Sequence, residues 1–164
     1  MNDCKSFKLS IDNHSKILIL GSMPGVKSLA EQQYYAHPQN RFWKVMGNIC
    51  NEPKLHEYSY GLKLTTLLKN NIALWDTIKS CDREGSLDSD IQDETPNDIK
   101  SLLNKYPSIK TICLNGNKSY SVFKKYFPNL LEKYNYHKMP STSPANARYS
   151  LDTLIKEWAI IVLK

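Results

Sequence analysis

The sequence predicts a layered α/β domain built on a mostly parallel sheet. Short apolar runs typical of buried strands alternate along the chain with segments of helical periodicity. Each predicted strand ends in an unusual loop, at the sequences GSMPG, WDT, NGN and PSTSP. In a parallel sheet such loops lie along one edge, where ligands bind. We therefore expect a binding site at that edge.

Length and composition limit the alternatives. The 164 residues, of which 41% are hydrophobic, suit one domain covering 1–164. No run is long enough to cross a bilayer, and the first ten residues lack a signal-peptide core, which predicts a cytoplasmic protein with no membrane partner. A monomer is the default expectation. The net charge of +6 suits a polyanion-binding protein or an ordinary basic surface.

The cysteines argue against metal and disulfide frameworks. The four cysteines of the chain are widely scattered, without a CxxC pair or a cluster of histidines. We therefore predict no metal site, and we expect buried thiols at Cys50 and Cys113, which lie in apolar settings.

The first half of the chain is predicted to contain two strands and three helices. Residues 1–15 are polar and read as a surface lead-in. A strand follows at Ile17–Leu20, and Ile72–Trp75 forms a second strand that ends at Asp76. Helices are expected over 27–33, 41–50 and 62–69, the second preceded by Asn40 as a candidate N-cap.

The second half begins with a polar, acidic stretch over 82–98, expected to be an exposed excursion. Pro96 is placed at the first position of a helix that runs to Tyr106. Strands are expected at 111–114 and 134–139, and helices at 118–126 and 150–163.

The first loop resembles a nucleotide-binding loop, but two of its residues argue against that function. Residues 21–28, GSMPGVKS, nearly match a P-loop, but Val26 replaces the required glycine and Pro24 removes an amide donor. No GxGxxG pattern exists for a dinucleotide site. A serine hydrolase is disfavoured because Ser22 lacks the G-x-S-x-G elbow.

A pocket for a flat ring fits better. Residues 34–43 combine aromatic rings with His37, Asn40 and Arg41, as recognition of an unpaired base requires. Phe42 and Trp43 are more typical of core residues that anchor the next helix, whereas for Tyr35 and Asn40 a functional role is favoured.

These residues resemble the uracil-DNA glycosylase superfamily, and within it the hypoxanthine (deoxyinosine)-DNA glycosylases. The similarity includes GSMPG, YYAHPQNRFW, ALWD, LNG and STSPANAR in order, and it covers nearly the whole chain. YYAHPQNRFW is the most specific element. Mismatch-specific uracil and thymine glycosylases, with a similar A-x-P-x-N-R-F-W segment, are the nearest competitors.

The resemblance implies a three-layer α/β/α fold with a central four-stranded parallel sheet. It also implies an enzyme that flips a deaminated base out of DNA and hydrolyses its N-glycosidic bond to leave an abasic site, with no cofactor. Flipping costs least for a mispaired base.

The resemblance assigns the catalytic role to Asn40. Met23 occupies the position of a water-positioning asparagine in the mismatch-specific branch, and its side chain cannot do that work. In the hypoxanthine group the corresponding asparagine is that of the YAHPxN loop, which is Asn40 here. A neutral amide can hold water but is no general base. His37 is a candidate acid for the leaving base, with a structural role as the alternative.

The base pocket is expected to contain Gly21, Ser22, Met23, Tyr35, Asp76 and Asn115. Tyr35 matches the stacking aromatic of the family. Asp76 matches a base-reading position, and its carboxylate can accept a ring N–H from hypoxanthine or uracil.

The STSPANAR segment is expected to contact DNA through Ser141, Ser143, Pro144, Ala145, Asn146 and Arg148. Ser141 replaces a histidine of the family motif, which puts its oxyanion role in doubt. Ala145 replaces a bulky wedge, and Arg148 is expected to meet backbone phosphate.

The leading hypothesis is a monofunctional glycosylase that removes hypoxanthine. The same chemistry on uracil or mismatched bases is the nearest alternative. A catalytically silent nucleic-acid-binding relative is the third, because both Met23 and Ser141 replace polar groups of the family.

Overall fold

The structure is a computed structural model that describes residues 3–162. Its centre is a four-stranded parallel sheet in the order β3-β2-β6-β7, formed by Ile72–Asp76, Ile17–Gly21, Thr111–Asn115 and Asn135–Met139. All four strands were predicted within one residue at each end, and the parallel arrangement is confirmed.

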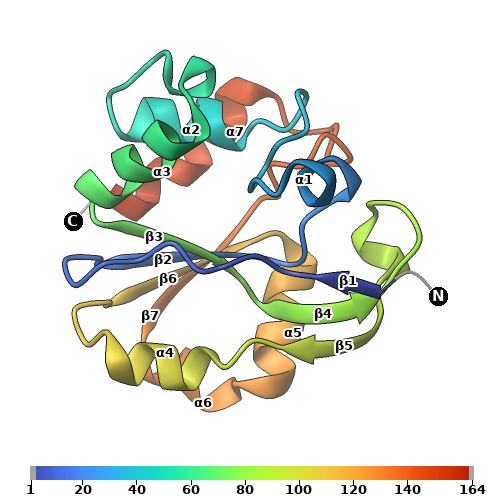
Figure 1. Cartoon of the computed structure of the whole chain (residues 1–164). Helices are drawn as coiled ribbons and strands as arrows, with labels where there is room; N and C mark the ends of the chain where they lie inside the picture. The colour runs from blue at the N-terminus through green and yellow to red at the C-terminus, as the bar shows by residue number, and fades with distance from the viewer. Residues whose placement is uncertain (1–2, 163–164) are drawn as a thin grey trace.

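Helices cover both faces of this sheet (Figure 1). Helices α2 (Phe42–Ile49), α3 (Tyr60–Lys69) and α7 (Leu151–Trp158) lie on one side, together with α1 (Val26–Glu31). Helices α4 (Ile99–Lys105), α5 (Asn117–Tyr126) and α6 (Pro128–Lys133) lie on the other. The predicted three-layer fold is therefore confirmed.

The central strand β2 explains why two cores form. Alternate side chains of a strand point to opposite faces, so Ile17 and Ile19 pack under α2 and α7, whereas Leu18 and Leu20 pack toward α4 and α5. All five residues of β2 are buried, as expected for a central strand covered on both sides.

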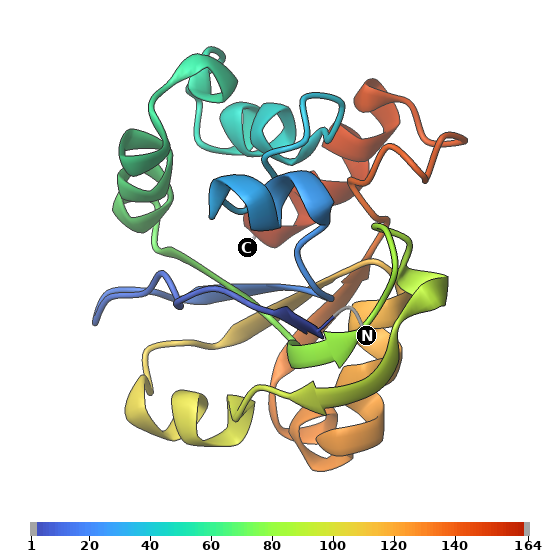
Figure 2. The same ribbon diagram turned by 45° about the vertical axis from the view of Figure 1, so that its right-hand side comes forward.

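A second, antiparallel sheet was not predicted, although the stretch over 82–98 is largely exposed as expected. Its order is β1-β4-β5, formed by Asp3–Lys5, Ile78–Asp82 and Gln92–Pro96. The polar lead-in thus contributes a paired strand, and the expected excursion over 82–98 contains β5 and a 3₁₀ turn at Asp88–Asp90. Figure 2 shows this sheet beside the carboxyl end of β3. Sequence patterning missed it because β1 has only three residues, and its pairing with β4 is distant in sequence.

The helix predicted to start at Pro96 was also misplaced. Pro96 ends β5, and α4 begins after Asp98, whose Oδ1 accepts a hydrogen bond from the Ser101 amide at 3.1 Å. Helix α6 was not predicted. The last helix is shorter than expected and continues as a 3₁₀ turn over Ala159–Val162, while the predicted end at residue 163 lies outside the described residues.

All four cysteines are buried, as expected for Cys50 and Cys113. Within residues 3–162, no helix combines the length and apolar character needed to span a bilayer.

Candidate functional site

A cavity of about 800 Å³ lies at the carboxyl edge of the parallel sheet, where the loops were predicted to converge. Every residue predicted for the site lines it. They are Gly21, Ser22, Met23, Tyr35, His37, Asn40, Asp76, Asn115, Ser141, Ser143, Pro144, Ala145, Asn146 and Arg148. The volume suits a single base with its sugar.

Tyr35 forms one wall of the cavity and is held on two sides. Its ring stacks on Phe42, with centroids 3.9 Å apart and planes inclined by 17°. Its hydroxyl accepts a hydrogen bond from Asn115 Nδ2 at 3.0 Å. Burial raises the pKa of this phenol far above its ordinary value, so the ring stays neutral and keeps its proton. The residue adopts φ of 55°, a left-handed conformation that is uncommon without glycine.

The floor of the cavity is formed where β2 and β3 end. Gly21 is the register partner of Asp76. A Cβ atom on Gly21 would lie 2.6 Å from Asp76 Oδ1 and 2.8 Å from the Tyr35 hydroxyl oxygen, closer than van der Waals contact permits. Glycine at this position therefore allows the carboxylate and the phenol to approach one another.

Asp76 is almost completely buried, with 3% of its surface exposed. Burial raises the pKa of its carboxyl group to about 7, and a hydrogen bond from Ser6 Oγ at 2.8 Å opposes this rise. Nearby Asp88 raises the pKa further and Arg83 lowers it. Both protonation states of this carboxyl are therefore accessible near neutral pH.

Asn40 lies half-buried at the start of α2. Its Oδ1 accepts a hydrogen bond from the Phe42 amide at 2.9 Å. The N-cap of α2 is Arg41, so the predicted N-cap position at Asn40 was wrong by one residue. The Nδ2 of Asn40 has no hydrogen-bond partner among the residues that the structure describes. Because an amide oxygen has two lone pairs, Oδ1 can still accept from a water molecule.

His37 lies nearby and is exposed. Its Nδ1 accepts a hydrogen bond from the Gln39 amide at 3.1 Å, and its carbonyl accepts from the Asn40 amide at 2.9 Å. The first contact fixes the tautomer of the neutral ring, which then carries its proton on Nε2.

Asn115 connects the strand edge to the last loop of the site. Its Oδ1 accepts from the Thr142 amide at 3.2 Å, and its Nδ2 donates to Thr142 Oγ1 at 3.2 Å as well as to Tyr35. Both ends of the amide are thus engaged within the protein. A direct contact of Asn115 with the base stays a prediction.

Arg41 organises the 141–149 loop, a role that sequence reasoning missed. Its guanidinium donates to the carbonyls of Ser143 at 2.8 Å and Asn146 at 3.1 Å, and also to those of Thr142 and Tyr149. Its backbone amide donates to Thr142 O at 3.1 Å. These contacts span more than a hundred residues of sequence, so no local pattern reveals them.

Within this loop the predicted DNA-contacting side chains are partly used for its own turns. Ser141 Oγ accepts from the Ser143 amide, and Ser143 Oγ accepts from the Ala145 amide, both at 3.1 Å. Asn146 Nδ2 donates to Ser141 O at 3.0 Å. Ala145 and Arg148 are exposed at the rim.

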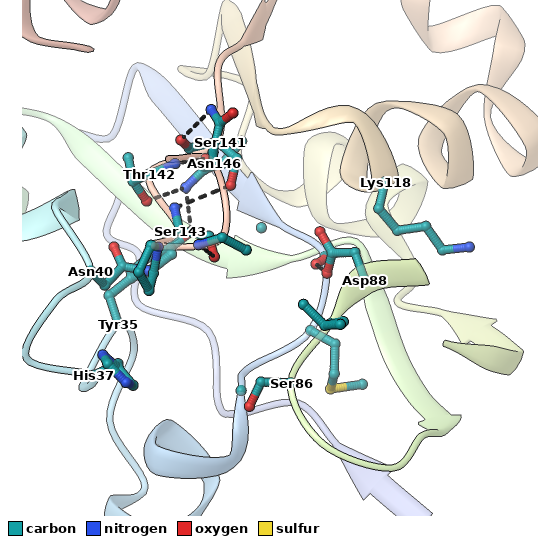
Figure 3. Close-up of a pocket in the computed structure, with 18 of the residues that line it drawn as sticks. Tyr35, His37, Asn40, Ser86, Asp88, Lys118, Ser141, Thr142, Ser143 and Asn146 are labelled. Atoms are coloured by element: carbon teal, nitrogen blue, oxygen red, sulfur yellow. Dashed lines mark hydrogen bonds between the residues drawn. The ribbon is translucent and has the colours of Figure 1, made fainter. Parts of the chain in front are cut away.

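The β4–β5 connection supplies a further wall that was not predicted. Asp88 Oδ1 accepts from Ser22 Oγ at 2.6 Å, and Ser86 Oγ accepts from the Val26 amide at 2.8 Å. These contacts attach the connection to the GSMPG turn. Figure 3 shows Asp88 and Lys118 across the cavity from Asn40 and His37. Burial raises the pKa of Asp88, and the Ser22 hydrogen bond opposes the rise.

Comparison with known proteins agrees with this architecture. Residues 8–161 match the family model described as the uracil DNA glycosylase superfamily. A protein from Methanosarcina acetivorans named hypoxanthine DNA glycosylase is 42% identical over 148 residues, covering 89% of this chain and 90% of that protein. Its namesake from Methanosarcina barkeri is 39% identical over 156 residues, covering 94% and 95%.

A solved structure extends the agreement to three dimensions. The solution NMR structure of a uracil DNA glycosylase candidate from Methanosarcina acetivorans superimposes with a TM-score of 0.83 at 39% identity, covering 97% of this chain and 96% of that one. This chain therefore belongs to the uracil DNA glycosylase superfamily.

Proposed function

We propose that this protein is a monofunctional DNA glycosylase that removes hypoxanthine and leaves an abasic site. The observation that carries the proposal is the placement of Asn40 and Met23 in one cavity. The Asn40 amide can hold a water molecule by hydrogen bonding, whereas Met23 in the strand-end turn is apolar. Two relatives named hypoxanthine DNA glycosylase, similar over 89% and 94% of this chain, support the same substrate.

The flipped base is proposed to stack on Tyr35. Phe42 fixes the plane of this ring, so the base meets a rigid surface. Ionised Asp76 accepts the N1–H of hypoxanthine from the floor of the cavity. Adenine has no proton at N1, so it leaves this carboxylate without that donor and binds less well.

The N-glycosidic bond is proposed to break with Asn40 beside the attacking water and His37 beside the leaving base. The bond between C1′ and the base breaks, and its electron pair goes to the base, while the sugar gains oxocarbenium character. Asn40 holds a water molecule whose oxygen then bonds to C1′. Because an amide cannot take up the water proton, that proton passes to solvent. His37, whose Nε2 has no hydrogen-bond partner among residues 3–162, is proposed to protonate the departing base.

The loop over 141–148 is proposed to hold the DNA. Ser141, Ser143 and Asn146 would offer polar groups to phosphate oxygens, and Arg148 would pair with a phosphate. Pro144 and Ala145 would face the gap left by the flipped nucleotide. One chain supplies every proposed group, so the protein is proposed to act as a monomer, and a DNA substrate fits the cytoplasmic location expected from the sequence.

Incubation with duplexes that carry one hypoxanthine or one uracil, followed by alkaline cleavage, tests the proposal. We expect strand cleavage at hypoxanthine, with loss of cleavage but retained DNA binding in Asn40→Ala. Preferential cleavage at uracil would favour the second candidate function, because Asp76 can also accept the N3–H of uracil. Binding without cleavage of either would identify a catalytically silent relative, and full activity of Asn40→Ala would refute the role of this residue.

A further inference from the structure

Two tyrosines and one lysine form a surface feature near the cavity, which we call the tyrosine–lysine strip (Tyr120, Tyr136 and Lys138). The rings of Tyr120 and Tyr136 stack, with centroids 6.2 Å apart and planes inclined by 26°. The ammonium group of Lys138 lies 4.8 Å from the centre of the Tyr120 ring. The Tyr136 side chain is exposed, with 39% of its surface accessible.

The strip begins close to the cavity, at the carboxyl end of β7. Lys138 directly precedes Met139, which lines the cavity, and the side chains of these two residues point to opposite faces of the sheet. Strand β7 is an edge strand of the parallel sheet, so no further strand covers its outer side. A chain that leaves the cavity past the carboxyl end of β7 can therefore follow the strip.

Charge favours this exit over the opposite rim. Residues 117–139 contain five lysines and one glutamate, a net charge of +4. Residues 82–98, which include the Asp88 wall, contain seven acidic residues and one arginine, a net charge of −6. Lys125 of α5 is engaged by Glu94 at 3.2 Å, whereas Lys138 has no ion-pair partner within residues 3–162. A phosphate backbone is repelled from the acidic wall and attracted to the strip.

We propose that the tyrosine–lysine strip binds unpaired DNA next to the excised nucleotide. Lys138 contacts a phosphate, and the exposed ring of Tyr136 stacks on a base. Interleaved cations and aromatic rings are typical of single-strand binding, since bases in a duplex are already stacked on one another. The inference rests on the proposed function, because it takes the cavity to hold a nucleotide of the same strand.

Binding of undamaged single-stranded DNA, measured by fluorescence anisotropy over a range of salt concentrations, tests this surface. Lys138→Gln should weaken binding several-fold and reduce the salt dependence by about 0.7 in the slope of log K against log salt. Tyr136→Ala should weaken binding about 5-fold or more with an unchanged slope. Tyr136→Phe keeps the ring and should bind as the parent does.

Lys105→Gln is the matched control. Its ammonium group lies 5.7 Å from the Tyr106 ring, so it removes the same type of contact. Lys105 ends α4 and precedes β6, at the opposite end of the sheet from the cavity. This variant should bind like the parent.

Equal binding by Lys138→Gln and Lys105→Gln would overturn the proposal, as would equal losses on duplex and single-stranded DNA in Tyr136→Ala. Thermal unfolding of each variant distinguishes lost contacts from lost structure. Because undamaged DNA is used, the result does not depend on the base that is removed. Absence of hypoxanthine excision together with strip-dependent binding would refute the proposed function alone.

Discussion

Replacement of Asp76 by asparagine should change stability and activity in opposite directions. The pKa of this carboxyl lies near 7 in the fold, against an ordinary value of 3.8. Since one pKa unit corresponds to about 1.4 kcal/mol, keeping the buried carboxylate ionised at pH 8 costs about 4 kcal/mol of folding free energy. Asparagine has a similar shape and no charge, so Asp76→Asn removes this cost.

The sign of the pH dependence follows from the direction of the shift. Between pH 4 and 7 the folded protein binds a proton at Asp76 that the unfolded chain has released, so this group makes the protein less stable as pH rises. As pH rises, the unfolding free energy of Asp76→Asn should therefore exceed that of the parent by an increasing amount. Between pH 5 and pH 8 this excess should increase by about 2.5 kcal/mol.

Urea unfolding at pH 5 and pH 8, followed by tryptophan fluorescence, measures this difference. Single-turnover excision of hypoxanthine supplies the second readout. Parent activity should rise through pH 7 as Asp76 ionises, while the variant should be nearly inactive at every pH. A stability difference that stays constant from pH 5 to 8 would refute the desolvation of Asp76.

Asp98→Asn is the matched control for this experiment. Asp98 is exposed, and hydrogen bonds from Ser101 lower the pKa of its carboxyl group. Its contribution to folding stability is therefore complete above the ordinary aspartate pKa and is lost only at lower pH. Its stability difference from the parent should stay constant between pH 5 and pH 8, and its excision activity should be normal.

Three further substitutions test other parts of the site. Arg41→Met leaves several loop carbonyls without their charged donor, so we expect a loss of about 3 kcal/mol in unfolding free energy and a much lower kcat; an unchanged melting temperature and kcat would contradict this. Gly21→Ala places a methyl group 2.6 Å from Asp76 Oδ1, so excision should fall at least about 10-fold while folding loses about 1–3 kcal/mol; normal excision kinetics would show that the floor is not closely packed. Ala145→Leu adds an apolar wedge at the rim, so excision from well-paired duplexes should rise several-fold while excision from single strands stays constant; equal effects on both substrates would exclude a wedge at this position.

The local sequence determined much of the fold because its signals are short-range. Apolar runs that end at glycine, aspartate or asparagine located three of the four parallel strands, and the fourth, β7, is a polar strand at the sheet edge. The parallel arrangement then brought their terminal loops to one edge. For the same reason every predicted site residue lies at the cavity. Asn40 is an example, since it lies two residues before a helix with clear periodicity.

Tertiary structure alone decided which side chains hold those residues in place. Arg41 reaches carbonyls 101 to 108 residues away, and Asp88 meets Ser22 across 66 residues. The acidic stretch showed no periodic pattern, because β5 is largely exposed and pairs only with β4. Neither periodicity nor composition records such contacts. They form because the folded chain brings distant donors and acceptors into a buried region where unpaired polar groups are costly.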